Sequence, residues 1–320
     1  MSPRFLSTPF AHHFVQLSSS ERTCELPFAV GGATQQGTAH VEDNQNNQDA
    51  LIVRLLPNTI IGVVGDGCAS THESLRDTIS NNEVGARILG HACARATANL
   101  VVQGLSPDDA AFWGLVEDSL LETSRALLDV LVGPQEEQRA TAALDFLTTT
   151  LLVFVVTPVC YSVYGCGDGV LAVNGKIRVL PTHGAYLSSL LLGAGATHEK
   201  GEARPRALAC LAKGATHSLN SLFLATDGFA DLVNAAEGIL LPMLGGLAAH
   251  PREGFDFLLK EFRQRILSDS RMEKHPALSN WPRDDASFLL LRRVASAGAA
   301  TLATESVQQM GDSSDKPHSN

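Results

Sequence analysis

Short runs of apolar and β-branched residues recur along this chain, separated by polar and glycine-containing segments. Runs of this length and composition predict β-strands. The predicted strands cover Ala50–Leu55, Ile60–Val64, Thr148–Val156, Val159–Tyr164, Gly169–Val173, Lys176–Leu180, Ser218–Ala225 and Ala286–Arg293. Asn174-Gly175 lies between two of them and predicts a tight hairpin, because both residues tolerate positive φ.

Other stretches place their apolar residues at helical spacing. The predicted helices run from about Asn82 to Asn99, from Ser106-Pro107 to a stop at Gly133-Pro134, and over Gly254–Leu267. Asn81 or Asn82 can cap the first helix. Ser106 and Asp109 resemble a capping box at the start of the second helix, where Pro107 suits the first turn.

The order of these elements predicts an α+β fold. Strands joined by hairpins form antiparallel sheets, and helices that follow in pairs must cover sheet faces. The economical arrangement is a four-layer α-β-β-α sandwich of two antiparallel sheets flanked by helices. A doubly wound parallel sheet would need strand and helix to alternate regularly, which residues 147–181 do not do.

The length of 320 residues suits one large domain or two small ones. We expect one folded domain over 26–294, with flexible extensions at 1–25 and 295–320, since both ends are rich in small and polar residues without sustained periodicity. Residues 183–216 are rich in glycine, alanine and histidine and match no element pattern.

Charge and cysteine usage narrow the class of protein. The net charge of −10 disfavours a nucleic-acid partner and gives no attraction to an anionic membrane. No apolar run approaches the roughly 20 residues of a membrane span, and the N-terminal stretch makes a poor signal peptide. The six cysteines form no Cys-x-x-Cys pair, which predicts reduced thiols. We therefore expect a cytoplasmic monomer.

Acidic residues stand at the ends of several predicted strands. The pairs Asp66-Gly67, Asp168-Gly169 and Asp227-Gly228 each follow one strand, Asp49 precedes another, and Asp284 opens the last. Any one Asp-Gly pair is most simply an ordinary hairpin turn. Their repetition at distant positions instead favours a site where all five acids meet at one sheet edge.

Carboxylates gathered in this way raise one another's pKa, and a divalent cation would relieve the repulsion. Oxygen donors without histidine or cysteine favour Mg²⁺ or Mn²⁺. Gly67 has no side chain, so its carbonyl can approach a metal closely. Two ions roughly 3.5–4 Å apart would hold a hydroxide for in-line attack on phosphorus. A cysteine-dependent phosphatase would need a loop ending in arginine after Cys68, and residues 68–75 provide none.

The order of short motifs carries a family resemblance. The motifs are Gly37-Thr38-Ala39-His40, Asn47-Gln48-Asp49-Ala50, Val64-Gly65-Asp66-Gly67, Cys68-Ala69-Ser70, Glu83-Val84-Gly85-Ala86, Thr149-Thr150-Leu151, Gly167-Asp168-Gly169, Ala225-Thr226-Asp227-Gly228 and Asp284-Asp285-Ala286-Ser287. Over about 34–292, they resemble the metal-dependent Ser/Thr protein phosphatases, the PPM or type 2C family, and most of all a bacterial branch.

The resemblance implies roles for the acids. Asp66 would bridge two metal ions, and Gly67 would bind one of them through its carbonyl. Asp227 and Asp284 would hold the other, with Asp49 assisting directly or through water. Asp168 matches the acid that binds a third, weaker ion in bacterial members. The segment at about 184–216 falls where the family carries its flap.

The sequence also departs from the family pattern. Many members place an arginine shortly before the first acid to bind the phosphate, but His40 to Asn47 contains no arginine or lysine. His40 either binds the phosphate or makes a local backbone contact. Eukaryotic members have histidine where this chain has Cys68. Thr71–Ile79 resembles an insertion that forms a surface loop.

These features predict a metal-dependent protein serine/threonine phosphatase. It would hydrolyse phosphoserine and phosphothreonine in a phosphorylated protein substrate, by attack of a water activated by two metal ions. The alternative is a catalytically inactive phosphatase fold that binds a phosphorylated partner, motivated by the missing arginine and by Cys68. A third interpretation is a metal-dependent hydrolase of small phosphoesters.

Overall fold

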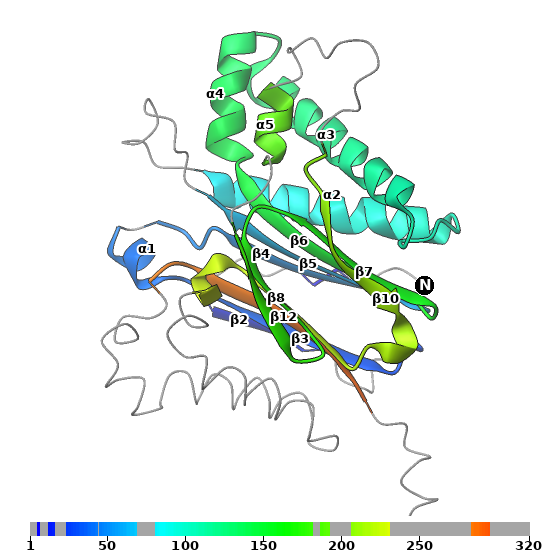
Figure 1. The fold of residues 1–320 in the computed structure, drawn as a ribbon. Coiled ribbons are helices and arrows are strands. Elements are labelled where there is room, and N and C mark those ends of the chain that lie inside the picture. The colour runs from blue at the N-terminus through cyan, green and yellow to red at the C-terminus, as the bar shows by residue number, and fades with distance from the viewer. Residues whose placement is uncertain are drawn as a thin grey trace, which may run out of the picture.

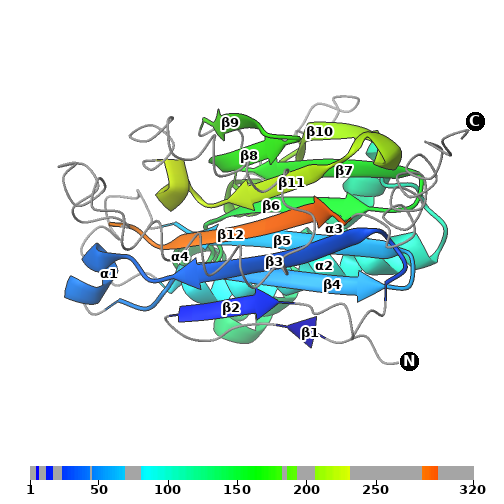
Figure 2. The ribbon, with the colours of Figure 1, turned by 90° about the horizontal axis from the view of Figure 1, so that it is seen from below.

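The computed structural model describes residues 5–6, 12–16, 24–43, 45–68, 81–181, 186–192, 206–230 and 283–294. In this part of the chain the strands form two antiparallel sheets of six strands each. The sheets are stacked face to face, as the two views show (Figures 1 and 2). The predicted helix Gly254–Leu267 and the insertion Thr71–Ile79 lie outside the described residues.

The first sheet has the strand order β1-β4-β5-β6-β7-β10. Its strands are β1 (Phe5–Leu6), β4 (Asp49–Leu56), β5 (Thr59–Gly67), β6 (Thr149–Val156), β7 (Cys160–Cys166) and β10 (Ala209–Ala215). The middle of the sheet is built by strands that are near neighbours in sequence and pair antiparallel. The predicted strands here are confirmed, apart from shifted ends.

The second sheet has the order β2-β3-β12-β11-β8-β9. Its strands are β2 (His12–Gln16), β3 (Phe28–Gln35), β12 (Ala286–Arg293), β11 (Ser221–Ala225), β8 (Gly169–Val173) and β9 (Lys176–Leu180). The predicted hairpin between β8 and β9 is confirmed, since Asn174 and Gly175 take φ values of 51° and 79°. The last described strand, β12, lies inside the sheet between β3 and β11.

Two short strands come from the segment 1–25, which we expected to be a flexible extension. β1 pairs with β4, and β2 pairs with β3, so each contributes a strand to the edge of one sheet. The strand β3 was not predicted either. Its sequence carries neighbouring glycines, Gly31 and Gly32, in place of an uninterrupted apolar run.

The main helices cover the outer face of the first sheet (Figure 1). They are α2 (Asn82–Val102), α3 (Ala110–Val132), α4 (Glu136–Phe146) and α5 (Leu187–Leu192), with the short α1 (Thr38–Glu42) at one end of the sandwich. Helix α2 packs on β4, β5 and β6 and against α3. None of the helices in the described residues is long and apolar enough to cross a membrane.

The helix boundaries correct two predictions. The second helix begins at Ala110, not at Ser106-Pro107, because the Asp109 side chain caps it by accepting from the Ala111 N–H at 2.9 Å. Asn81 occupies the N-cap position of α2 but makes no side-chain cap hydrogen bond. The helix α4 was not predicted, and its described buried residues are only the small Ala142 and Ala143.

The core has two layers, and the central strands of the first sheet contribute to both. Alternate residues such as Ile61 and Val63 face the helices, whereas Ile60 and Val64 face the second sheet. A strand that is buried on both faces needs apolar residues at every position, which explains the uninterrupted apolar runs in the sequence. The predicted α+β sandwich of antiparallel sheets is therefore confirmed.

Candidate metal centre

The predicted acids come from strand ends at one edge of the sandwich, where α1, the start of α2 and the start of β12 also lie (Figure 1). Asp49 is the first residue of β4 and Asp66 the next-to-last of β5, and the two are direct partners in the antiparallel ladder. Directly opposite residues project from the same face of a sheet. The pairing therefore holds two carboxylates next to each other.

Three of the acids form one compact group. Asp66, Asp168 and Asp227 each offer a carboxylate oxygen, and these oxygens lie within 4.8 Å of one another. Asp168 lies in the turn between β7 and β8, where its neighbours Gly167 and Gly169 take φ values of 83° and 133°. Asp227 begins the 3₁₀ turn η5 (Asp227–Phe229), directly after β11. Asp66 lies within its strand, so the Asp66-Gly67 pair is not a hairpin turn.

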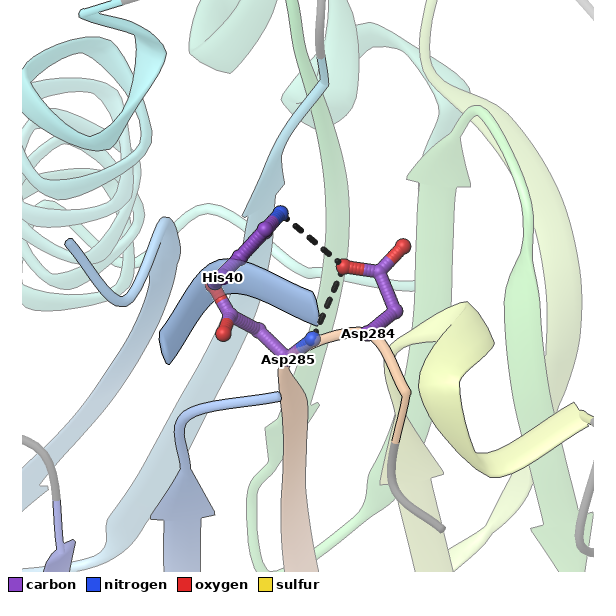
Figure 3. Close-up of side chains that lie close together, drawn as sticks. All are labelled: His40, Asp284 and Asp285. Atoms are coloured by element: carbon purple, nitrogen blue, oxygen red, sulfur yellow. Dashed lines mark hydrogen bonds and ion pairs between the residues drawn. The ribbon is translucent and has the colours of Figure 1, made fainter. Parts of the chain in front are cut away.

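Asp284 and Asp285 form a second group with His40 (Figure 3). His40 Nε2 lies 3.5 Å from Oδ1 of Asp284, and His40 Nδ1 lies 2.9 Å from Oδ2 of Asp285. The Asp284 side chain is 57% exposed, whereas that of Asp285 is only 1% exposed. The sequence predicted phosphate binding or a backbone contact for His40. It did not predict this position between two carboxylates.

The acids of the site are buried and crowded, which raises the pKa of Asp49 and of Asp66. Burial raises the pKa of Asp66 well above its usual range, and the charges of Asp227 and Asp284 add to the shift. Burial likewise raises the pKa of Asp49, with contributions from Asp66 and Asp285. All five predicted acids are thus within electrostatic reach of the same small volume. Such crowding destabilises the metal-free carboxylates.

The oxygen atoms of the predicted ligands suit divalent cations. Asp49 Oδ2 accepts from the Thr226 hydroxyl at 3.0 Å, but its other oxygen is buried without a hydrogen-bond partner among the described residues. The predicted ligands offer oxygen atoms only, which suits the hard ions Mg²⁺ and Mn²⁺. The residues that would hold the ions are Asp49, Asp66, Gly67, Asp168, Asp227 and Asp284.

The start of helix α2 packs directly against the site. A Cβ atom on Gly67 would lie 2.6 Å from the carbonyl carbon of Asn82, so only glycine fits here without a shift of the backbone. The Asn82 side chain accepts from the Thr148 N–H at 2.9 Å and donates to the carbonyl of Cys68. Asn82 therefore holds the end of β5 to the helix and does not serve as a cap.

The Cys68 thiol lies beside the acids, with Sγ 3.6 Å from the Asp66 carbonyl oxygen. Burial raises the pKa of Cys68 well above its ordinary value, and the carboxylates of Asp66 and Asp168 raise it further. Since the thiolate is the nucleophile, a thiol kept neutral in this way is unsuited to covalent catalysis. This agrees with the sequence argument against a cysteine-dependent phosphatase.

The sequence reasoning missed several residues at the site. Asp285 is buried at its edge, and Tyr186 lies near enough to Cys68 and Asp168 that they add to the effect of burial in raising its pKa. Arg87 of α2 donates to the Asn47 carbonyl at 3.3 Å, which brings a guanidinium to the segment that itself lacks arginine. A signal existed only for Asp285, as part of the acidic pair Asp284-Asp285.

The fold is a sandwich of two antiparallel sheets, and it gathers acidic residues from distant strand ends at one edge. A family model described as "Protein phosphatase 2C" matches residues 36–274, well over half of the chain. The chain belongs to the protein phosphatase 2C family. No curated protein matches it.

Solved structures of phosphatases match this chain at low sequence identity. A bacterial serine phosphatase matches at 15% identity and a TM-score of 0.50, covering 83% of this chain and 98% of its own. The catalytic domain of the phosphatase PstP, in complex with two manganese ions, matches at 16% identity and a TM-score of 0.46, covering 84% and 99%. The Staphylococcus aureus phosphatase Stp1 matches at 15% and 0.48, covering 90% and 96%.

Proposed function

We propose that this chain is a Mg²⁺- or Mn²⁺-dependent protein serine/threonine phosphatase. The observation that carries the proposal is the convergence of Asp66, Asp168 and Asp227, whose carboxylate oxygens lie within 4.8 Å of one another. Burial raises the pKa of Asp49 and of Asp66, and neighbouring carboxylates raise both further, a repulsion that a bound cation would relieve. Membership of the phosphatase family supplies the class of substrate, a phosphorylated protein.

Each predicted ligand has a proposed role. Asp66 and Gly67, together with Asp227, Asp284 and Asp49, would hold two ions, and Asp168 would contribute to a third, weaker position. Bound ions would supply positive charge for the phosphate and an activated water for its hydrolysis. The chain itself fixes the carboxylates, through the β4–β5 ladder and through the Thr226 hydroxyl on Asp49.

The inactive phosphatase fold, which would bind a phosphorylated partner without hydrolysing it, makes a different prediction. All five predicted acids interact electrostatically with Asp66 or Asp49 at one edge of the described structure, which supports the enzyme. Phosphate binding by His40 stays a prediction. Its ring lies against Asp284 and Asp285 at 3.5 and 2.9 Å, a geometry that favours another role.

The decisive experiment is a phosphatase assay on the full chain with phosphoserine and phosphothreonine peptides and with a generic aryl phosphate. We expect turnover with Mn²⁺, loss of turnover with chelator, and loss in the Asp66→Ala variant. Glu122→Gln, an exposed acid on α3, is the matched control and should keep full activity.

The same assay separates the other two functions. Phosphopeptide binding without Mn²⁺-dependent turnover would establish the inactive binding protein and reject the enzyme. Turnover of nucleotides or other small phosphoesters far above that of phosphopeptides would replace the proposed protein substrate with a small molecule.

A further inference from the structure

Asp285 is a buried charge that the predicted ligand set does not use. Its Oδ1 accepts from the Gly37 N–H at 2.8 Å, and its Oδ2 accepts from the Gln48 N–H. These two donors flank the segment that contains α1 and leads to Asp49. One carboxylate with 1% exposure therefore joins the start of β12 to the segment before β4.

His40 extends this connection to the predicted ligand Asp284. Its Nδ1 is 2.9 Å from Asp285 and its Nε2 is 3.5 Å from Oδ1 of Asp284 (Figure 3). The same Oδ1 accepts from the backbone N–H of Asp285 at 2.8 Å. Helix α1 is itself held to this strand start by a hydrogen bond from the Ala39 N–H to the Arg283 carbonyl, at 2.9 Å.

The result is a chain of contacts, from Asp285 through the imidazole of His40 to the carboxylate of Asp284. The Asp284 side chain is 57% exposed, and His40 adds a side-chain contact to the one backbone hydrogen bond that holds its Oδ1. A histidine held by one buried carboxylate can restrict the orientation of a second one. Partners of this kind, one step removed from the metal, are known to influence metal affinity strongly.

We propose that Asp285 and His40 are positioning residues of the metal centre, which orient Asp284 for the ion it binds. The proposal rests on the proposed metal-dependent function and assigns His40 a task other than phosphate binding. Both ring nitrogens face carboxylates, an arrangement that suits the orientation of a ligand better than the capture of an anion.

The test measures Mn²⁺ binding to the full chain by titration calorimetry, without substrate. We expect about ten- to a hundredfold weaker binding at the position that includes Asp284 in His40→Ala and in Asp285→Asn. His40→Gln, whose amide can still reach Asp284, should recover part of the affinity. His217→Ala, an exposed histidine of the turn η4 (Thr216–Ser218), is the control and should bind Mn²⁺ like the wild type.

Inorganic phosphate distinguishes this role from phosphate binding. In protein saturated with Mn²⁺, phosphate affinity should be the same in His40→Ala as in the wild type. A weaker phosphate affinity with unchanged Mn²⁺ affinity would overturn the proposal and establish His40 as a phosphate ligand. Should Asp285→Asn fail to fold, the partly exposed His40 still provides the test through His40→Ala and His40→Gln.

Failure of the inference differs from failure of the proposed function. Unchanged Mn²⁺ affinity in His40→Ala, with full phosphatase turnover in the wild type, rejects the positioning role alone. Weakened Mn²⁺ affinity in the variants, with no turnover in the wild type, rejects the phosphatase and keeps the positioning role. A wild-type chain that binds no Mn²⁺ overturns both.

Discussion

Asp49 and Asp66 face each other directly across the antiparallel pair β4–β5, so that two carboxylates share one end of the first sheet. The Asp49 side chain is buried, and burial raises the pKa of both carboxyls, with the charge of Asp66 adding to the shift of Asp49. Neither side chain forms an ion pair among the described residues. This pairing favours a cation and disfavours the metal-free state, and several measurable consequences follow from it.

Asp66→Asn should affect stability and activity in opposite directions. The substitution removes one charge from a cluster in which the pKa of Asp66 is raised well above normal. Because burial and neighbouring carboxylates both disfavour the ionised Asp66 side chain, we expect the metal-free variant to be more stable than the wild type at pH 7. Mn²⁺-dependent turnover should be lost. Urea unfolding in chelator measures the first effect, and a less stable variant would contradict the interpretation of repulsion.

The metal-free protein should lose stability as pH rises. A raised pKa means that the folded state binds protons more tightly than the unfolded state. The contribution of Asp49 and Asp66 is therefore fully present below their unfolded pKa, near 4, and is lost as pH rises through the raised folded values. The loss is up to about 1.4 kcal/mol per pH unit for each proton, shared by the interacting pair.

The Asp49→Asn variant isolates this effect. In chelator, the wild type should lose stability relative to the variant as pH rises above about 4. Added Mn²⁺ should stabilise the wild type more than the variant, because the variant lacks one of the proposed ligands. Unfolding curves collected at a series of pH values provide the measurement. If the unfolding free energies of the two proteins changed in parallel with pH in chelator, the pKa of Asp49 would not be raised in the folded state.

Glu117 should stabilise the connection between α3 and the segment before β10. Its side chain is 1% exposed, and Oε2 accepts from the backbone N–H groups of Ala207 and Leu208 at 2.8 and 3.0 Å. Glu117→Ala leaves both donors without this acceptor, which costs about 1–3 kcal/mol for each donor that stays buried. Chemical unfolding measures the loss, with the exposed Glu122→Ala as the control. A loss as small as that of the control would contradict the role.

Gly67→Ala should reduce both stability and activity. The added methyl would lie 2.6 Å from the carbonyl carbon of Asn82, which is backbone and cannot simply rotate away. Overpacking of this kind costs about 1–3 kcal/mol and would move the start of α2 relative to Asp66. Gly65→Ala, in the same strand, meets the Leu151 side chain at 3.2 Å and should cost less. An equal loss of stability in both variants would reject this explanation.

Much of the fold could be predicted because the local sequence decides it. The apolar runs of β5 and β6 and the turn at Asn174-Gly175 carry their own signals, and each is confirmed. The unpredicted elements lack such signals. β10 is mostly exposed and carries small residues, α4 buries only two alanines among its described residues, and β3 contains neighbouring glycines. Their conformation depends on tertiary contacts, which a local sequence pattern does not show.

The candidate site also contains some features that the sequence predicts and others that it does not. Acids at strand ends are visible in a sequence, and the antiparallel topology brings Asp66, Asp168 and Asp227 together. The sequence does not show which of two neighbouring acids points inward. Asp284 is exposed and Asp285 buried because β12 enters the sheet beside β3, where the Gly37 N–H meets Asp285. For the same reason, the position of His40 between them could not be anticipated.

The interior position of β12 also has a consequence for biosynthesis. This strand is the last in the described chain, yet it lies between β3 and β11 and brings Asp284 and Asp285 to segments about 240 residues earlier. A nascent chain on the ribosome cannot complete the second sheet or the ligand set until residues 284–293 have emerged. The proposed ligand set is therefore complete only after this strand has been synthesised, and a product truncated before Asp284 would carry the other acids without it.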